Sequence, residues 1–319
     1  MNNLVSIAMS TYNGEAFLRE QLDSILNQTY KNLEIIISDD CSTDNTIEII
    51  KEYQDKDKRI VFHQNKKNLG FVKNFENAIS LCTGDYIALS DQDDIWKPNK
   101  IELFVSQIKE NSLIYSNATL IDKNSKEKNK SFIKEDNIRQ WKSNIPFLLY
   151  NVISGNTMMF KKELLNHILP FPNNITYHDF WIAFVASTYG TITYTQEPMI
   201  FYRKHSEQVT FSKKQTHKNY LQKLQHKKEN LIKQAKNKIY NLKAFRTLSI
   251  LDNDTKKILD LLISNYSNYE NIYFNTQLYN FLKNNADAIF VQYDPKKRKK
   301  QAFRHSIGLK LNAITLYRI

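Results

Sequence analysis

Residues 33–53 read LEIIISDDCSTDNTIEIIKEY and decide the fold, because a strand, a polar turn and a helix follow one another within them. The strand candidate is 33–38, where consecutive isoleucines suit a strand that is covered on both faces. Apolar residues at helical spacing occupy 46–53. Asp39 and Asp40 stand between the two elements, so the stretch predicts a β-strand that hands an acidic pair to the turn before a helix.

The same unit occurs before and after this stretch. An apolar run at 5–10 leads into helical spacing at 17–26, a strand candidate at 60–63 leads into a helix at 71–82, and another strand candidate covers 86–89. Strands that alternate with helices of about 10–15 residues indicate βαβ units. We therefore predict an α/β fold with a Rossmann-like, mostly parallel central sheet flanked by helices.

Polar residues gather where three of these strands end, at 10–13, 39–40 and 90–94. Ligands of such sheets bind at the carboxyl ends of the strands, so these clusters predict the functional site. Neither a G-x-G-x-x-G nor a Walker-type loop occurs in the sequence. The common dinucleotide-binding and P-loop classes are therefore disfavoured.

The charge is divided unevenly along the 319 residues, whose formal net charge is +12. Residues 1–203 hold 22 basic and 25 acidic residues (−3), whereas residues 204–319 hold 23 basic and 8 acidic residues (+15). The apolar pattern of the second part is helical, so we predict a domain at 1–212 and a basic α-helical region at 213–319. A hydrophobic content of 41% and only two cysteines exclude a disordered chain and a disulfide scaffold. No signal peptide or membrane-spanning apolar run is visible, so a cytoplasmic protein is expected.

Asp91, Asp93 and Asp94 form a compact group of carboxylates directly after an apolar strand. Such close acids repel one another unless water or a cation separates them. Mg²⁺ or Mn²⁺ typically uses one or two protein carboxylates together with substrate phosphates, so either ion is a suitable partner. The alternative is an Asp-rich turn that caps the helix following Pro98.

Five segments within residues 3–205 carry a family resemblance: VSIAMSTYNGEAFLREQLDSILNQTY, LEIIISDDCSTDNT, NLGFVKNFENAIS, GDYIALSDQDDIWKPNK and HDFW. Together they resemble the inverting family 2 glycosyltransferases, which have the GT-A fold. SDQDDIW, SGNTMMF and YRKHSEQV are most similar to bacterial rhamnosyltransferases that build surface polysaccharides. The resemblance implies that Asp91 lies near the donor sugar and ribose, and that Asp93 binds the Mg²⁺ or Mn²⁺ that bridges the diphosphate.

The resemblance also implies a nucleotide-binding role for residues after the first two strands. Asp40 would accept a hydrogen bond from the imide N–H of a pyrimidine base, as in uridine or thymidine. Ser10 and Tyr12 would flank the base and the ribose or deoxyribose. Asp39 has a structural alternative, which is to cap the turn before the second helix.

Four further residues are expected near the donor on the same ground. Lys73 and Asn74 would reach the donor sugar or phosphate, although Lys73 is equally expected as a solvated helix residue. Arg203 and His205 would pair with the diphosphate, with a surface salt bridge as the alternative for Arg203.

The predicted general base is Asp179, in the segment YHDFW at 177–181. From local sequence alone it is an N-cap of the following helix; within the family pattern, an acid two residues before Trp181 matches the base that takes the acceptor's proton. His178 stands where the family more often has an acid, and would bind the acceptor or orient Asp179. Trp181 is either core or a stacking face for a sugar.

Lys296–Lys300 form a basic run, KKRKK, before a stretch in which Phe303, Ile307, Leu311 and Ile314 would share one helical face. A polybasic run beside an amphipathic helix suits an anionic membrane surface. Binding to nucleic acid is disfavoured, since no motif for it is present and the acidic cluster would repel phosphates.

These observations predict a metal-dependent inverting glycosyltransferase at the cytoplasmic face of the plasma membrane. Its donor would be a nucleoside diphosphate sugar of the dTDP or UDP type, with rhamnose as the expected sugar, and its acceptor a lipid-linked glycan or an oligosaccharide. The alternatives are a nucleotidyltransferase and a non-catalytic carbohydrate-binding or scaffolding subunit.

Overall fold

The computed structural model describes residues 3–133, 138–205, 208 and 220–311. The chain divides into two compact units. The first comprises Met1–Lys142, Asn151–Phe171 and Tyr177–Phe211, and the second comprises Ser143–Tyr150, Pro172–Thr176 and Ser212–Ile319. The second unit thus includes two short segments that precede residue 212. A division of the chain into two consecutive sequence ranges does not describe such a unit.

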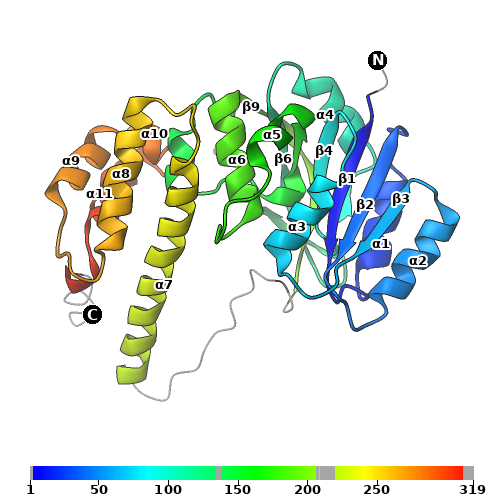
Figure 1. Cartoon of the computed structure of the whole chain (residues 1–319), viewed down its shortest axis with the longest axis horizontal. Helices are drawn as coiled ribbons and strands as arrows, with labels where there is room; N and C mark the ends of the chain where they lie inside the picture. The colour runs from blue at the N-terminus through cyan, green and yellow to red at the C-terminus, as the bar shows by residue number, and fades with distance from the viewer. Residues whose placement is uncertain (1–2, 134–137, 206–207, 209–219, 312–319) are drawn as a thin grey trace. The chain divides into compact units, whose positions relative to one another are not determined.

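The first unit is built on a sheet with the strand order β3-β2-β1-β4-β8-β6-β9-β5, and β7 pairs with β6 (Figure 1). Its first half is parallel: β1 (Val5–Thr11) pairs with β2 (Leu33–Asp39) and β4 (Tyr86–Ser90), and β2 pairs with β3 (Ile60–Gln64). These strands are the four apolar runs from which the sequence predicts a βαβ arrangement, and that prediction is confirmed.

The other half of the sheet is mixed. β8 (Met158–Lys161) pairs antiparallel with β4 and with β6 (Leu113–Asp122), and β7 (Glu127–Ser131) pairs antiparallel with β6. β9 (Ile192–Lys204) is parallel to β6 but antiparallel to β5 (Ile95–Trp96). The sequence patterns do not indicate these antiparallel pairs, because pairing between distant strands leaves no local sequence signal.

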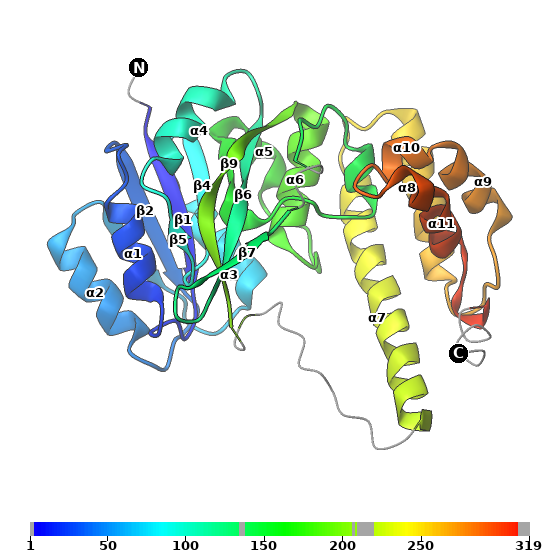
Figure 2. The ribbon, with the colours of Figure 1, turned by 180° about the vertical axis from the view of Figure 1, so that it is seen from behind.

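Helices cover both faces of the sheet, as strands buried on both faces require. α3 lies in front of the sheet in Figure 1, and α1 lies in front of it in the reverse view of Figure 2. The helices and 3-10 turns of this unit that matter for the site are α1 (Leu18–Leu26), α2 (Thr46–Lys56), α3 (Phe71–Ser80), α4 (Lys100–Ile108), η3 (Gly155–Thr157), η4 (Lys162–Leu164), α5 (Leu165–Ile168) and α6 (His178–Tyr189).

The core of the first unit lies directly behind the carboxyl ends of β1 and β2. Ile7, Met9, Ile35 and Ile37 are fully buried in one hydrophobic cluster. Burial of such a side chain contributes about 1.5–3 kcal/mol. The polar residues that follow these strands therefore stand on a rigid base.

The second unit is helical, as the sequence predicts. Side chains cap three of its helices, since Asp252, Asn275 and Asp294 accept hydrogen bonds from backbone N–H groups of the first turns of α8, α9 and α11. The elements are η2 (Ile145–Leu148), α7 (Tyr220–Arg246), α8 (Asn253–Ser267), α9 (Thr276–Asn284), α10 (Ala286–Ile289) and α11 (Pro295–Ser306).

The basic run at 296–300 belongs to α11 itself, the helix that also contains Phe303. α11 ends at Ser306, and buried Ile307 pairs with Phe274 in an antiparallel bridge. A Cβ at Gly308 would lie 2.1 Å from the carbonyl oxygen of Ile272, so this close backbone approach requires glycine. The predicted helical face is therefore wrong at Ile307. Its last member, Ile314, lies outside the described residues.

Within the described part of the chain, none of the helices combines the length and the hydropathy that crossing a membrane requires.

Candidate active site

The polar segments that follow β1, β2 and β4 begin at one edge of the sheet. In the register of β1, Ser10 lies opposite Ser38, and Met9 lies opposite Ser90. The structure thus brings together the three clusters at 10–13, 39–40 and 90–94. They stand at the carboxyl ends of parallel strands, where ligands of such sheets bind.

Asp40 is held by hydrogen bonds on both carboxylate oxygens. Its Oδ1 accepts from Asn65 Nδ2 at 2.9 Å and from Leu69 N at 2.8 Å, and its Oδ2 accepts from Gly70 N at 2.8 Å. Gly70 has φ +82°, a conformation that other residues rarely adopt, so glycine here brings the backbone N–H to the acid. A carboxylate has about four acceptor positions, so one on Oδ2 remains for a ligand such as a base N–H. Asn65 is not among the residues predicted from the sequence. Its position directly after β3 is a feature that could have indicated it.

Asn74 lies on α3 and joins three elements. Its side chain is fully buried; Nδ2 donates to Ser10 Oγ at 2.7 Å and to Ser38 O at 2.9 Å, and Oδ1 accepts from Asn65 Nδ2 at 2.9 Å. A direct contact with the donor would require these bonds to open. That predicted contact stays a prediction, and the geometry favours a different role, which is to hold the hydroxyl of Ser10.

Tyr12 and Lys73 have exposed side chains. The ring of Tyr12 is 47% exposed, while its backbone is fixed by Gln92, which accepts from Tyr12 N at 2.8 Å and donates to Tyr12 O at 3.0 Å. Such a ring is available to lie against a base. Lys73 forms an ion pair with Glu76 and agrees with the alternative of a solvated helix residue.

Asp39 agrees with its structural alternative. The carboxylate is fully buried and accepts from Thr11 Oγ1 at 2.9 Å, from Ser42 N at 2.9 Å and from Ser42 Oγ at 2.5 Å. All three donors belong to the ends of β1 and the turn after β2. Asp39 therefore shapes the turn that presents Asp40.

The carboxylates after β4 have the opposite environment. Burial, followed by the charges of Asp94, Asp93 and Asp179, raises the pKa of Asp91 well above its ordinary value. Within the described residues, no hydrogen bond reaches the Asp91 carboxyl. Asp94 is fully buried; it accepts from the side chain of Asn156 and from Arg203 N, and burial and the nearby Asp93 raise its pKa to about 8. A cation bound beside these carboxyls would therefore favour their ionised forms.

Lys100 is a buried cation behind this cluster that the sequence analysis missed. Its side chain is fully buried, Nζ donates to Asn156 O at 2.8 Å, and Nζ lies 3.3 Å from the ring centre of Trp96. Burial holds the pKa of Lys100 well below its usual range. Its signal was helical spacing, because Lys100 lies four and eight residues before Phe104 and Ile108 on the buried face of α4.

Arg203 is a buried structural anchor. Its side chain is fully buried; Nη2 pairs with Glu20 at 2.7 Å, Nε donates to Asp93 O at 2.8 Å, and the guanidinium lies over the ring of Phe17. The side chain is not at the surface, so the alternative of a surface salt bridge is wrong, whereas the predicted contact with the diphosphate stays a prediction. Diphosphate binding by Arg203 would need these bonds to open, so the geometry favours positioning of the acidic loop. His205 also contacts this acidic loop, since its Nε2 lies 2.8 Å from Asp93 Oδ2.

The pair Asp91 and Asp93 fits a divalent cation. No cluster of three or more His, Cys, Asp or Glu side chains in the described part of the chain is arranged to hold a metal ion. Mg²⁺ and Mn²⁺ need only one or two protein carboxylates when substrate phosphates and water complete the shell. An Asp91 carboxyl without internal donors, beside two other acids, meets that requirement.

Asp179 lies in the first turn of α6, whose N-cap is Tyr177, so the alternative of an Asp179 N-cap is wrong. Its Oδ2 accepts from Gly155 N at 3.2 Å, whereas its Oδ1 is buried and has no hydrogen-bond partner among the described residues. Burial raises the pKa of Asp179 to about 6. Most of the group is therefore ionised at neutral pH, with one carboxylate oxygen that can accept a proton.

His178 packs against the helix behind it. Its ring stacks on Phe75 with centroids 3.9 Å apart, and neither ring nitrogen has a hydrogen-bond partner in the described structure. The two predicted roles of His178, binding the acceptor or orienting Asp179, stay predictions. Burial lowers the pKa of His178 to about 3, so the imidazole is neutral. Gly155 leaves room for the ring, since a Cβ there would lie 2.8 Å from His178 Nε2.

Trp181 belongs to the core. It is 3% exposed, and its Nε1 donates to Ile168 O at 2.9 Å. It therefore positions α6 and does not offer a face to a sugar.

The comparisons with known proteins agree on one family. Residues 6–169 match the model of "Glycosyl transferase family 2". An uncharacterized glycosyltransferase of Haemophilus influenzae is 30% identical over 317 residues, which span 93% of this chain and 96% of that protein. The glucosyltransferase WfgD of Escherichia coli is 36% identical over 124 residues, 38% of this chain and 48% of its own. Its full name is UDP-Glc:alpha-D-GlcNAc-diphosphoundecaprenol beta-1,3-glucosyltransferase.

One solved structure illustrates the likeness of fold. Residues 1–349 of S. aureus TarS, in complex with UDP-GlcNAc, have a TM-score of 0.62 and 16% identity over 99% of this chain and 91% of that one. At this identity the likeness concerns the fold alone. It confirms the predicted GT-A architecture with a helical C-terminal region.

Proposed function

Because the chain belongs to glycosyl transferase family 2, we propose that it moves a sugar from a nucleoside diphosphate donor to a hydroxyl group of a lipid-linked glycan. The protein is a glycosyltransferase, which sets aside nucleotidyl transfer and a purely scaffolding role. The observation that carries the proposed chemistry is the Asp179 carboxylate, whose buried Oδ1 has no hydrogen-bond partner among the described residues.

The transfer is a single displacement. The acceptor hydroxyl oxygen attacks C1 of the donor sugar, the bond between C1 and the diphosphate oxygen breaks, and the hydroxyl proton passes to Asp179 Oδ1. One attack on C1 inverts its configuration. The pKa of Asp179, raised by burial to about 6, suits a general base that works near neutral pH.

Asp91 and Asp93 would hold Mg²⁺ or Mn²⁺. When bound, the ion neutralises the charge that develops on the diphosphate. Asp40, with one acceptor position unused, would take the N–H of a uracil or thymine base, and the exposed ring of Tyr12 would lie beside it.

The donor and acceptor are proposed by class. WfgD, as its name states, uses UDP-Glc and a diphosphoundecaprenol-linked acceptor, which supports a UDP or dTDP donor and a lipid-linked acceptor here. Rhamnose as the sugar and work at the cytoplasmic face of the membrane stay predictions from the sequence.

The test is Asp179→Asn in a panel of nucleotide sugars with Mn²⁺. We expect turnover to fall about 10²–10⁴-fold while donor binding, measured by calorimetry, stays within about threefold. Asp23→Asn, which removes an acid of the same unit that accepts from Tyr53 Oη, is the matched control and should retain activity. Near wild-type turnover in Asp179→Asn would exclude Asp179 as the base.

A further inference from the structure

The exposed side of α11 carries a stripe of cations without internal partners. Lys296, Lys297, Lys299, Lys300 and Arg304 are exposed, and none forms an ion pair with a described residue. Arg298 differs, because it pairs with Asp287 at 2.8 Å and donates to Tyr293 O. The opposite side of α11 is buried through Gln301, Ala302 and His305. The charges therefore face solvent from an anchored helix.

This arrangement is unfavourable for α11 alone. Lys296 and Lys297 stand in its first turn, where the helix dipole favours negative charge. Lys296 and Lys300 are four residues apart, as are Lys300 and Arg304, so like charges face each other along the helix. An anionic partner would remove both penalties.

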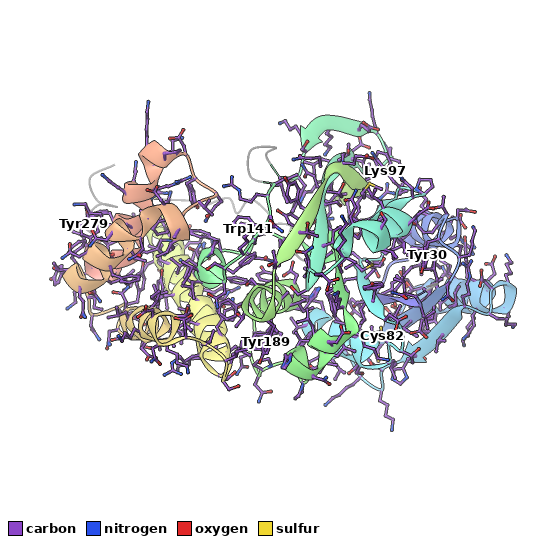
Figure 3. The ribbon with its side chains drawn as sticks, turned by 90° about the horizontal axis from the view of Figure 1, so that it is seen from above. Tyr30, Cys82, Lys97, Trp141, Tyr189 and Tyr279 are labelled. Carbon is purple, nitrogen blue, oxygen red and sulfur yellow. The ribbon has the colours of Figure 1, made fainter. Side chains whose placement is uncertain are left out.

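Aromatic rings lie beside the cations. Phe303 is three and four residues after Lys300 and Lys299, and so shares their helical face; its ring is 43% exposed. Tyr273 is 56% exposed, and Lys310 Nζ lies 5.2 Å from its ring centre. The ring of Tyr279 on α9, labelled in Figure 3, lies 6.3 Å from that of Phe303.

From this juxtaposition we propose that the basic-aromatic face, formed by Lys296, Lys297, Lys299, Lys300, Phe303, Arg304, Tyr273 and Lys310, binds the surface of an anionic lipid bilayer. A helix of 12 residues is about 18 Å long, so its cations spread over a surface and do not converge on one phosphate. Lysine stems and exposed rings enter the boundary between headgroups and acyl chains, while the ammonium groups remain among the phosphates. Nucleic acid is disfavoured because four of the five exposed α11 cations without a described ion pair are lysines, which lack the planar fork of arginine for bases and phosphates.

The inference rests on the proposed function only in that a lipid-linked acceptor gives membrane binding a purpose. The intact protein is sedimented with vesicles of phosphatidylcholine, with and without phosphatidylglycerol, at about 0.15 M salt and without donor or acceptor. We expect binding to the anionic vesicles alone, weakened at least about tenfold when Lys296, Lys297, Lys299 and Lys300 are all changed to Gln. Phe303→Ser should weaken it several-fold more.

The matched control changes Lys227, Lys228, Lys233 and Lys236 of α7 to Gln, because these four lysines are also exposed and belong to the same unit. Circular dichroism verifies folding of both variants, and donor hydrolysis, measured separately, should be unchanged in both. Equal loss of vesicle binding in the two variants, equal binding to neutral vesicles, or capture by single-stranded RNA in preference to anionic vesicles would each overturn the proposal. None of these outcomes bears on Asp179.

Discussion

The acids that follow β2 and those that surround the end of β4 differ in what their oxygens contact. Asp39 and Asp40 each accept three hydrogen bonds from the protein. Asp91 accepts none from the described residues, and Asp179 keeps a buried oxygen without a partner. Residue type and position at the sheet edge are similar, so the donors around each carboxylate make the difference.

This difference teaches which acids can do chemistry. A carboxylate that accepts several N–H bonds is stabilised in its charged form and holds the backbone in place. A carboxylate that is buried near other acids with few donors is destabilised as an anion, so binding a cation or a proton relieves it. We therefore expect the end of β2 to provide a fixed recognition surface, and the end of β4 with α6 to provide the reactive groups.

The largest expected effect concerns the cation. Asp91→Asn removes a carboxylate that accepts no hydrogen bond from the described residues, so we expect turnover to fall about 10²–10³-fold and the apparent Mn²⁺ affinity to fall with it. The measurement is initial rate against Mn²⁺ concentration, with chelated wild type as the reference. Asp40→Asn is the contrasting variant, since it should weaken donor binding and leave Mn²⁺ dependence alone. Full activity after complete chelation would remove the metal from the proposal.

The pH dependence tests Asp179 directly. Its pKa, raised by burial to about 6, means that the basic form is lost as pH falls through that value. We expect the rate to rise with pH up to about 6 and then level, with a slope of about tenfold per pH unit well below it. Measurement of kcat/KM as a function of pH, from the rising part of the curve to the level part, checks this. A limb that persists in Asp179→Asn, measured on its residual activity, would assign the titration to another group.

The positions of Asp40, Asp91 and Asp179 could be predicted from the sequence, because local patterns place these residues at strand and helix ends. The environment of each carboxylate could not. Asp40 depends on Asn65 and the backbone at Leu69 and Gly70, which reach it only after β3 and α3 are in place.

Arg203 shows the limit most clearly. Its position near the family's closing motif suggests a phosphate ligand, yet folding places it beneath Phe17 and against Glu20, far away in sequence. The burial of Lys100, by contrast, can be predicted from the sequence, because this lysine lies on the apolar stripe of Ile101 to Ile108. What the sequence cannot supply is the set of long-range partners, which the mixed half of the sheet brings together.

Stability should change in opposite directions at the two sites. Asp40→Asn replaces one of two accepting oxygens by an N–H₂ group, which must face either the N–H of Gly70 or that of Leu69, so we expect a loss of about 1–3 kcal/mol in the free energy of unfolding. Asp179→Asn removes a buried charge. Its folded pKa lies above the ordinary value of 3.8, so its ionisation opposes folding as pH rises from about 4 through 6.

Asp179→Asn should therefore be more stable than wild type by roughly 1–3 kcal/mol at pH 7, and the difference should vanish near pH 4. Urea unfolding of both variants at the two pH values measures this. If both variants lose stability at pH 7, the contrast between satisfied and unsatisfied carboxylates does not hold.

The smallest effect is expected at His178, where the sequence leaves the choice of base open. Its nitrogens are buried without described partners, its pKa is lowered by burial to about 3, and its ring fills the space between Phe75 and Gly155. His178→Leu keeps a similar volume and removes the unpaired polar atoms, so stability should change by less than about 1 kcal/mol and turnover by less than about threefold. Rate measurements beside Asp179→Asn decide the matter. A loss of a hundredfold or more in His178→Leu, with the fold intact by circular dichroism, would transfer proton acceptance or acceptor binding to the imidazole.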